Sequence, residues 1–255
     1  MLKESKINKL EIKIYPDRLA MGNAAADMVC NRIIQLLGEQ EFVNIIFAAA
    51  PSQNEFLAAL IRRNDVEWIR INAFHMDEYI GLPAGDSNLF SSFLKAKLFE
   101  HLSFRSVNYL NGNAPNMKAE CDRYAKLLHD NPTDMVCMGI GENGHIAFND
   151  PHVAHFDDPA MVKIVDLDLA CRQQQVNDGC FPTLNNVPTH AITLTISALM
   201  NGRYIYSIVP GKNKANAVYN TLFQPINEAC PASCLRTHSH AALFLDDDSS
   251  ALIKV

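Results

Sequence analysis

The sequence predicts an α/β protein with a Rossmann-like three-layer fold, in which helices flank a mostly parallel central sheet. Short apolar, β-branched segments alternate along the chain with stretches of helical periodicity, and this alternation is typical of βαβ units. Several of the short segments, such as Ile45-Ile46-Phe47, are apolar throughout, as expected of strands that are covered on both faces. Linkers, repeats and low-complexity stretches are missing from the sequence, so we expect one domain over residues 1–255.

Eight segments have the length, the apolar character and the β-branched content of strands. The predicted strands are Leu10–Tyr15, Phe42–Ala49, Glu67–Phe74, Met135–Ile140, Val162–Val165, Ala191–Ile196, Tyr204–Val209 and Ala241–Leu245.

Five segments between these strands carry apolar residues at helical spacing. Ser52-Gln53-Asn54-Glu55 matches a capping box, in which the first and fourth side chains cap a helix start. Asp86-Ser87 is a second helix start. The predicted helices are Ala20–Leu37, Ser52–Arg63, Ser87–Leu102, Met117–His129 and Lys212–Phe223.

Composition limits the kind of partner. The chain has 255 residues, 48% of them hydrophobic, and a net charge of −6, which argues against nucleic acid or an anionic membrane as partner. A few local groups can still hold an anionic small molecule. The start of the chain lacks the apolar core of a signal peptide, and no apolar run is long enough to span a membrane, so we expect a cytoplasmic protein.

The cysteines and histidines favour neither disulfides nor a metal centre. Seven cysteines at irregular spacing are typical of reduced thiols packed in a cytosolic protein. His238 and His240 could flank a metal ion, but no third ligand follows at a suitable spacing. The sequence therefore predicts no metal site.

Four loops follow predicted strands at residues 49, 74, 140 and 209, and they hold the unusual residues of the chain. In an open α/β sheet, ligands bind outside the carboxyl ends of the strands, so these loops form the expected site. The loop after residue 140 contains Gly141 and Gly144 on either side of Glu142-Asn143, followed by His145. Glycines let a backbone turn sharply and approach a ligand closely. A lone histidine is more often structural, but Asn143 and Asp150 beside this one favour an acid/base role.

The loop after residue 74 carries adjacent carboxylates, Asp77 and Glu78. Neighbouring side chains on extended backbone point in opposite directions, so one could face a pocket while the other caps or pairs. A carboxylate desolvated by a sugar ring would be a competent base for a carbon acid next to a carbonyl. The competing interpretation is a solvated surface pair.

The two remaining loops open helices and could hold an anion. Backbone N–H groups at the helix start near Ser52, Gln53 and Asn54 form an anion site, and the Ser52 hydroxyl adds a donor. Lys214, after Gly211, could supply a point charge to a phosphate. A surface lysine is the alternative for Lys214 taken alone.

These residues lie in motifs that resemble the glucosamine-6-phosphate deaminase (isomerase) family, whose fold is shared with 6-phosphogluconolactonases. The resemblance spans roughly residues 40–250, in family order. Weaker matches are 211–215 and Ser233-Cys234-Leu235 with His238. The specific motifs are Met76-Asp77-Glu78-Tyr79-Ile80-Gly81-Leu82-Pro83, Leu110-Asn111-Gly112-Asn113-Ala114-Pro115 and Gly144-His145-Ile146-Ala147-Phe148-Asn149-Asp150-Pro151.

The resemblance implies a role for each matching residue. Asp77 matches the base that moves a proton between C1 and C2 of the opened sugar, and His145 matches the acid/base that opens the ring. Asn143 and Asp150 match residues that orient the histidine or relay its protons. The implied phosphate or substrate ligands are Ser52, Gln53, Asn54, Gly141, Arg172 and Lys214.

The implied protein is a single sugar-phosphate isomerase/deaminase domain over residues 1–255 that needs no organic cofactor. The implied reaction converts glucosamine 6-phosphate and water to fructose 6-phosphate and ammonia. Its partner is a small phosphorylated sugar, with no nucleic acid and no membrane. The sequence leaves open whether the protein forms a homo-oligomer.

The sequence also departs from the family pattern. Pro51-Ser52-Gln53-Asn54-Glu55 replaces the usual phosphate loop, and Asp150 replaces the usual glutamate, which is longer by one methylene group. Ungapped alignment puts Gln175 where members carry a phosphate-binding arginine, and Arg172 lies one helical turn earlier; we nominate Arg172. The segment from His152 to Val162 lacks the residues that bind an allosteric activator in regulated members, so we expect no such activation.

Three alternatives compete with this function. One is a 6-phosphogluconolactonase, although Ile146-Ala147-Phe148 departs from the usual lactonase loop after Gly-His. Another is a deaminase or isomerase of a different hexosamine phosphate, such as galactosamine 6-phosphate. The third is a sugar-phosphate sensor without turnover, which would need neither Asp77 nor His145.

Overall fold

The computed structural model describes residues 3–253 and contains an eight-stranded sheet that is parallel except at one edge. At that edge β1 pairs antiparallel with β2. In sheet order the strands are β1 (Lys3–Ile7), β2 (Leu10–Tyr15), β11 (Ala241–Asp246), β10 (Tyr204–Val209), β7 (Met135–Met138), β3 (Val43–Phe47), β4 (Ile71–His75) and β6 (Ser106–Asn108). The predicted Rossmann-like α/β fold with a mostly parallel central sheet is confirmed.

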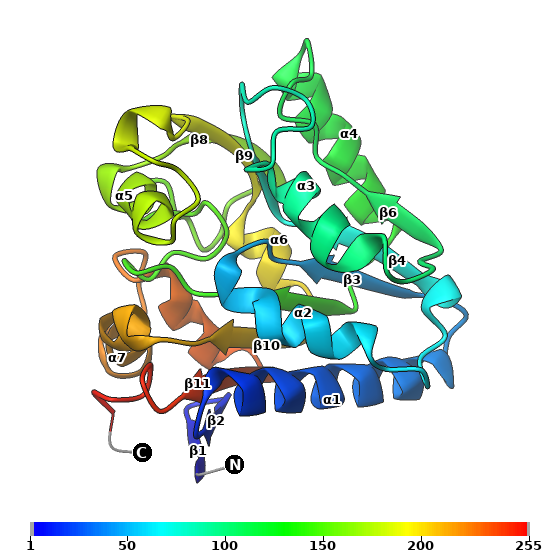
Figure 1. The fold of residues 1–255 in the computed structure, drawn as a ribbon, viewed down its shortest axis with the longest axis vertical. Helices are drawn as coiled ribbons and strands as arrows, with labels where there is room; N and C mark the ends of the chain where they lie inside the picture. The colour runs from blue at the N-terminus through cyan, green and yellow to red at the C-terminus, as the bar shows by residue number, and fades with distance from the viewer. Residues whose placement is uncertain (1–2, 254–255) are drawn as a thin grey trace.

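Two layers of helices cover this sheet, as the ribbon shows (Figure 1). On one face, α1 (Arg18–Leu37) and α2 (Asn54–Ile61) pack side by side and share a core cluster with every second residue of the strands. On the other face, α4 (Met117–Asp130), α6 (Ile196–Met200) and α7 (Ala215–Phe223) share a second cluster with the alternate residues. The sheet is therefore buried on both faces, which explains its nearly continuous apolar strands.

Helix α1 shows how the sequence sets its own boundaries. Asp17 caps the first turn, because its carboxylate accepts a hydrogen bond of 2.7 Å from the backbone nitrogen of Ala20. Met21, Ala25 and Val29 lie one turn apart and are buried against the sheet. The helix ends at Leu37, next to Gly38.

A second, three-stranded sheet is antiparallel and lies outside the central one. It consists of β5 (Asp77–Tyr79), β9 (His190–Leu194) and β8 (Val162–Asp166). The predicted strands Val162–Val165 and Ala191–Ile196 therefore exist but do not belong to the parallel sheet. Because β5 pairs with β9, the backbone of Asp77 is fixed by a ladder that no local sequence pattern indicates.

Several predicted boundaries were wrong. The N-terminal part of the predicted strand Glu67–Phe74 is a 3-10 turn, Trp68–Arg70, and the predicted helix Ser87–Leu102 becomes α3 (Phe90–Leu94) continued by a π-helical segment, Lys95–Phe99. The sequence prediction missed β1, β5, β6, α6 and α5 (Leu169–Asn177). Short elements and polar helices such as α5 give weak periodic signals, which explains these omissions.

The predicted capping box at Ser52 was also wrong. A 3-10 turn, Pro51–Gln53, precedes α2, whose first turn has no side-chain cap. Glu55 instead accepts two hydrogen bonds of 3.0 Å from Arg18 of α1. This ion pair draws the Glu55 carboxylate toward α1.

Strand order reverses beside β3, and this reversal positions the site. From β3 the chain adds β4 and β6 on one side, then returns to add β7 and β10 on the other. Loops on either side of such a switch point diverge and leave a crevice at the carboxyl ends of the strands. None of the helices in residues 3–253 has both the length and the apolar character needed to cross a membrane.

Candidate active site

One cavity lies at the switch point, and its walls come from all four loops that the sequence singled out. Among its lining residues, Ser52 follows β3, Asp77 follows β4, Gly141 and His145 follow β7, and Lys214 follows β10. The structure thus brings together five of the ten predicted site residues. Phe90, Phe148, Gln174 and Gln175 also line it.

The imidazole of His145 is held in one tautomer. Its Nδ1 atom lies 2.8 Å from Oδ1 of Asn143 and 3.1 Å from Oδ1 of Asp150. The Asn143 amide is itself oriented, because its Nδ2 donates to Asp150 at 2.9 Å and its Oδ1 accepts the backbone N–H of His145 at 3.0 Å. Two acceptors therefore face Nδ1, so Nδ1 carries the proton and Nε2 is left as the basic nitrogen.

Asp150 is fully buried and remains a carboxylate. Burial alone would raise its pKa, but the hydrogen bond and charge of His145, together with the Asn143 amide, outweigh this and hold the pKa below its usual value. The contact with His145 also shows that the shorter aspartate side chain still reaches the imidazole. Asn143 and Asp150 do not line the cavity; both contact His145, which does.

The loop around His145 is shaped by its backbone. A Cβ atom on Gly141 would lie 2.2 Å from Cε1 of His145, so only glycine leaves room for the ring. Ala147, which lines the cavity two residues later, has a φ of 50°. Left-handed backbone at a non-glycine residue costs free energy and is typical of functional loops that the surrounding structure holds in place.

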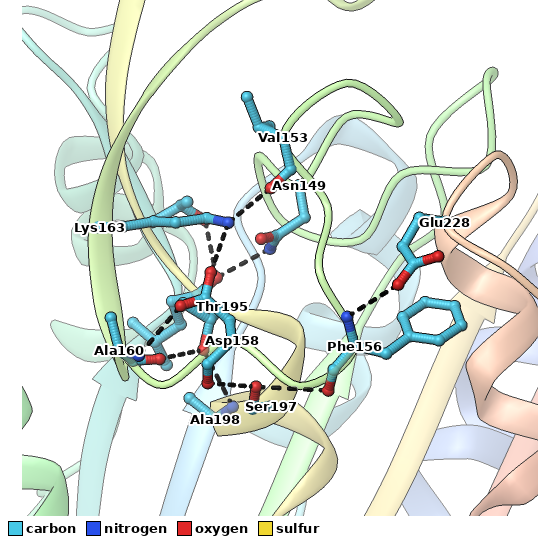
Figure 2. Close-up of polar contacts among 12 residues, drawn as sticks. Asn149, Val153, Phe156, Asp158, Ala160, Lys163, Thr195, Ser197, Ala198 and Glu228 are labelled. Atoms are coloured by element: carbon cyan, nitrogen blue, oxygen red, sulfur yellow. Dashed lines mark hydrogen bonds and ion pairs between the residues drawn. The ribbon is translucent and has the colours of Figure 1, made fainter.

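A network of hydrogen bonds fixes the chain on both sides of Asp150 (Figure 2). The buried Asn149 amide donates to the carbonyls of Ile146 and Leu194, at 2.9 and 2.8 Å. Lys163 holds the segment 153–158 in place, because its Nζ donates to Val153 O at 2.6 Å and to Asp158 at 2.8 Å. These bonds fix the backbone on both sides of Asp150 and so limit how far its carboxylate can move from His145.

Asp77 and Glu78 divide their roles as adjacent residues on a strand should. Glu78 caps α3, where it accepts backbone N–H bonds from Phe90 and Ser91, both at 2.9 Å. Asp77 lines the cavity and is 6% exposed. Burial, followed by the nearby charge of Glu78, raises the pKa of Asp77 well above its usual value. A raised pKa makes the ionised carboxylate a stronger base.

Lys214 supplies positive charge on the wall formed by β10. It is 7% exposed, and within residues 3–253 its Nζ has no hydrogen-bond or ion-pair partner. Burial lowers the pKa of Lys214, although Asp178 and Glu142 act in the opposite direction. An unpaired, buried cation in a cavity is a natural ligand for an anion.

Three predicted ligands lie elsewhere. Gln53 is 1% exposed and does not line the cavity; its amide bonds to Ser52 and to the backbone of β10. Asn54 also lies outside the lining. Arg172, nominated as a phosphate ligand, donates from Nη2 to the carbonyls of Leu184 and Val187, so the structure does not bring its guanidinium into the cavity.

Two glutamines of α5 were missed as wall residues. Gln174 is fixed, because its Oε1 accepts the backbone N–H of Glu142 at 2.8 Å while its Nε2 donates to Asp178. Gln175 is buried and makes no side-chain hydrogen bond within residues 3–253, so its amide is available to a ligand. The alignment already placed Gln175 at the position of the family's arginine, which was the signal available in the sequence.

Two groups of side chains that share Asp150 have the spacing of metal ligands: His145, Asp150 and Cys171, and Asp150, His152 and Asp168. His145, Asp150 and Cys171 offer nitrogen, oxygen and sulfur atoms within 4.8 Å of one another, a set that suits zinc. The imidazole and the carboxylate of this set already contact each other at 3.1 Å, and Asn143 bonds to both. This arrangement favours a proton relay.

Comparison with known proteins agrees with this architecture. A family model described as glucosamine-6-phosphate isomerases/6-phosphogluconolactonase matches residues 16–244. A glucosamine-6-phosphate deaminase of Bacillus cytotoxicus is 36% identical over 194 residues, which cover 76% of this chain and 72% of that protein. A glucosamine-6-phosphate deaminase of Bacillus thuringiensis is 38% identical over 194 residues with the same coverage.

Solved structures are similar over almost the whole chain. A monomeric glucosamine-6-phosphate deaminase superposes with a TM-score of 0.86 at 28% identity, covering 95% of this chain and 99% of that chain. A 6-phosphogluconolactonase from Thermotoga maritima superposes with a TM-score of 0.76 at 19% identity, covering 93% of this chain and 100% of that chain. The second likeness concerns the fold alone.

Proposed function

The chain belongs to the family of glucosamine-6-phosphate isomerases and 6-phosphogluconolactonases, and we propose that it converts glucosamine 6-phosphate and water to fructose 6-phosphate and ammonia. The observation that carries this proposal is the presence in one cavity of two separate proton-transfer groups, His145 and Asp77. In this proposal residues 1–255 form one sugar-phosphate isomerase/deaminase domain, which catalyses the reaction with its own side chains and without an organic cofactor. The relatives named deaminases support this choice of reaction.

Ring opening is the first step that the site must perform. The pyranose opens when a base removes the proton of the C1 hydroxyl and an acid protonates the ring oxygen, which yields the aldehyde. His145 suits this exchange, because its Nε2 is the basic nitrogen and its Nδ1 proton is held by Asn143 and Asp150. The Asp150 carboxylate stabilises the imidazolium that forms when Nε2 takes up a proton.

Proton transfer between carbons is the second step, and it needs a different base. Only the open-chain aldehyde acidifies C2, so the C2 proton can leave only after the ring has opened. Asp77 removes this proton while O1 takes up a proton, which gives an enol amine. Asp77 then delivers its proton to C1 and the nitrogen gives up a proton, so that C1 becomes an alcohol and C2 an imine. Water then adds to C2, ammonia leaves, and the ketone of fructose 6-phosphate remains. The raised pKa of Asp77 gives its carboxylate the basicity that this step requires.

In this proposal the phosphate end of the substrate binds to Ser52, Gln175 and Lys214, which all line the cavity. Lys214 provides the charge, and Ser52 and Gln175 provide neutral donors. Glu55 would repel a phosphate at this place, but its ion pair with Arg18 removes that obstacle. Gln175 instead of an arginine leaves Lys214 as the cation among the lining residues.

A lactonase or a sugar-phosphate sensor fits this cavity less well. Hydrolysis of a lactone requires no transfer of a carbon-bound proton, and binding alone requires no acid/base group. Burial of Asp77 next to Glu78 costs free energy, which neither activity would compensate. The pair of Asp77 and His145 therefore supports the isomerase/deaminase.

The direct test is incubation of the purified protein with glucosamine 6-phosphate, with galactosamine 6-phosphate as a parallel substrate. We expect ammonia and fructose 6-phosphate from the glucosamine substrate. Release of ammonia from galactosamine 6-phosphate alone would redirect the proposal to that sugar. Absence of ammonia from both substrates would refute the deaminase.

A further inference from the structure

We propose that Gln53 is a positioning residue that fixes the hydroxyl of Ser52 as a hydrogen-bond donor to the anionic group of the substrate. Gln53 is buried beneath the cavity, and Ser52 is part of the wall. The inference rests on the proposed function, because it takes that anionic group to be the phosphate of an amino-sugar phosphate.

The orientation of the Gln53 amide follows from its partner on β10. The amide nitrogen Nε2 lies 3.0 Å from the carbonyl oxygen of Ile208. A carbonyl oxygen only accepts hydrogen bonds, so the atom that faces it must be the nitrogen. The reverse orientation would place two carbonyl oxygens against each other.

The same nitrogen determines what Ser52 can do. Nε2 of Gln53 lies 3.2 Å from Oγ of Ser52 and uses its second hydrogen there. An amide nitrogen cannot accept, so Ser52 Oγ accepts this bond and its own proton must point elsewhere. Within residues 3–253 the Ser52 hydroxyl has no other side-chain partner, and it lines the cavity. The hydroxyl proton is therefore available to an anion.

Burial of Gln53 has a cost that a purely structural residue could avoid. Its Oε1 atom is buried and has no hydrogen-bond partner within residues 3–253. An unsatisfied buried carbonyl is unfavourable, and an apolar side chain of the same length would escape this cost. The close approach of Gly139, whose added Cβ would lie 3.2 Å from Nε2, shows that the backbone after β7 leaves room for the amide.

A double-mutant cycle with Gln53→Glu and Ser52→Ala tests the inference, with the KM for glucosamine 6-phosphate as readout. In the wild-type background, Ser52→Ala should raise KM roughly tenfold, the effect of losing one hydrogen bond to a charged group. The carboxyl group introduced by Gln53→Glu holds at most one proton, which the carbonyl oxygen of Ile208 takes, so it has none to give to Ser52 Oγ and accepts the Ser52 proton instead. In the Gln53→Glu background, Ser52→Ala should therefore change KM by less than twofold.

The cycle distinguishes a change in the direction of the hydrogen bond to Ser52 from electrostatic repulsion of the phosphate. If the carboxylate introduced by Gln53→Glu only repelled the phosphate, Ser52→Ala would still raise KM roughly tenfold in that background, and this result would overturn the proposal. Gln53→Met provides a neutral variant of similar length. We expect it to raise KM at least threefold while kcat and the thermal unfolding midpoint change little; an unchanged KM would overturn the proposal even if Gln53→Glu failed to fold.

Failure of the proposed function can be distinguished from failure of this inference. If the wild-type protein releases no ammonia, the same variants are titrated with inorganic phosphate by calorimetry. Ser52→Ala should then weaken phosphate binding in the wild-type background and leave it unchanged in the Gln53→Glu background. Equal weakening in both backgrounds, or no phosphate binding by the wild type, would overturn the inference.

Discussion

Oδ1 of Asp150 lies 3.1 Å from Nδ1 of His145, although the aspartate is shorter by one methylene group than the glutamate expected at this position. The rigid backbone around Asn149 and Lys163 makes this contact possible, because it holds Asp150 against the imidazole. The contacts of the proposed relay are therefore all present, and its parts can be tested one at a time.

Replacement of Asp150 should disable the relay without unfolding the protein. In Asp150→Asn an amide still reaches His145, but the charge that stabilises the imidazolium is lost. We expect kcat to fall by roughly 100-fold or more, the usual contribution of general acid–base catalysis. Steady-state kinetics with glucosamine 6-phosphate measures this. Asp130→Asn is the matched control, since it breaks an exposed ion pair with Lys126 on α4, outside the network that holds Asp150; a kcat equal to that of the control would contradict the relay.

Asp77→Asn should abolish turnover and make the protein more stable at alkaline pH. The pKa of Asp77 is raised in the folded protein, so the stability that its proton contributes is present at low pH and is lost as pH rises through the folded pKa. Asparagine cannot ionise and does not suffer this loss. Calorimetry should therefore give a higher unfolding midpoint for the variant at pH 8, with the difference shrinking as pH falls and vanishing only below the ordinary aspartate pKa of 3.8. A variant that is less stable at pH 8 would show that Asp77 is not buried as described.

The affinity for the phosphorylated sugar should weaken at alkaline pH because of Lys214. Its pKa is lowered by burial, so it loses its proton at a lower pH than a solvent-exposed lysine does. Above that pKa the proposed phosphate site has no lysine charge, and KM should rise. In Lys214→Gln we expect a KM that is high at every pH and does not rise further at alkaline pH. If KM of the variant rises with pH as steeply as KM of the wild type, the rise is due to a group other than Lys214.

Substitutions of Gln175 and of Arg172 should affect KM differently. Gln175→Arg adds a second cation to the cavity wall and should lower KM for glucosamine 6-phosphate, by roughly tenfold if the new ion pair is well formed. Arg172→Met should leave KM nearly unchanged but lower the unfolding midpoint, because the carbonyls of Leu184 and Val187 lose their donor. A large increase of KM in Arg172→Met would restore Arg172 as a phosphate ligand.

The sequence predicted the elements and residues that a strong local pattern specifies. Strands β2 and β10 were located to the residue, because apolar runs bounded by turns define them. The loops at the carboxyl ends of parallel strands followed from topology alone, and the structure brings Ser52, Asp77, His145 and Lys214 to one cavity as expected.

Features that depend on distant partners could not be predicted in this way. Strand β5 forms because β9 pairs with it from more than a hundred residues along the chain. Glu55 has the spacing of a capping residue, yet the charge of Arg18 on another helix captures it. Gln175 reaches the cavity only because α5 packs over it. Without knowledge of this packing, the charge of the nearby Arg172 made it the expected phosphate ligand.

The stoichiometry of products released by the wild-type protein and by Asp77→Asn tests the central claim most directly. We expect the wild type to release one ammonia for each fructose 6-phosphate formed from glucosamine 6-phosphate, and Asp77→Asn to release neither while it still binds inorganic phosphate. Undiminished release of both products by Asp77→Asn, or none by the wild type, would contradict the assignment of Asp77 and His145 to a two-step isomerase/deaminase.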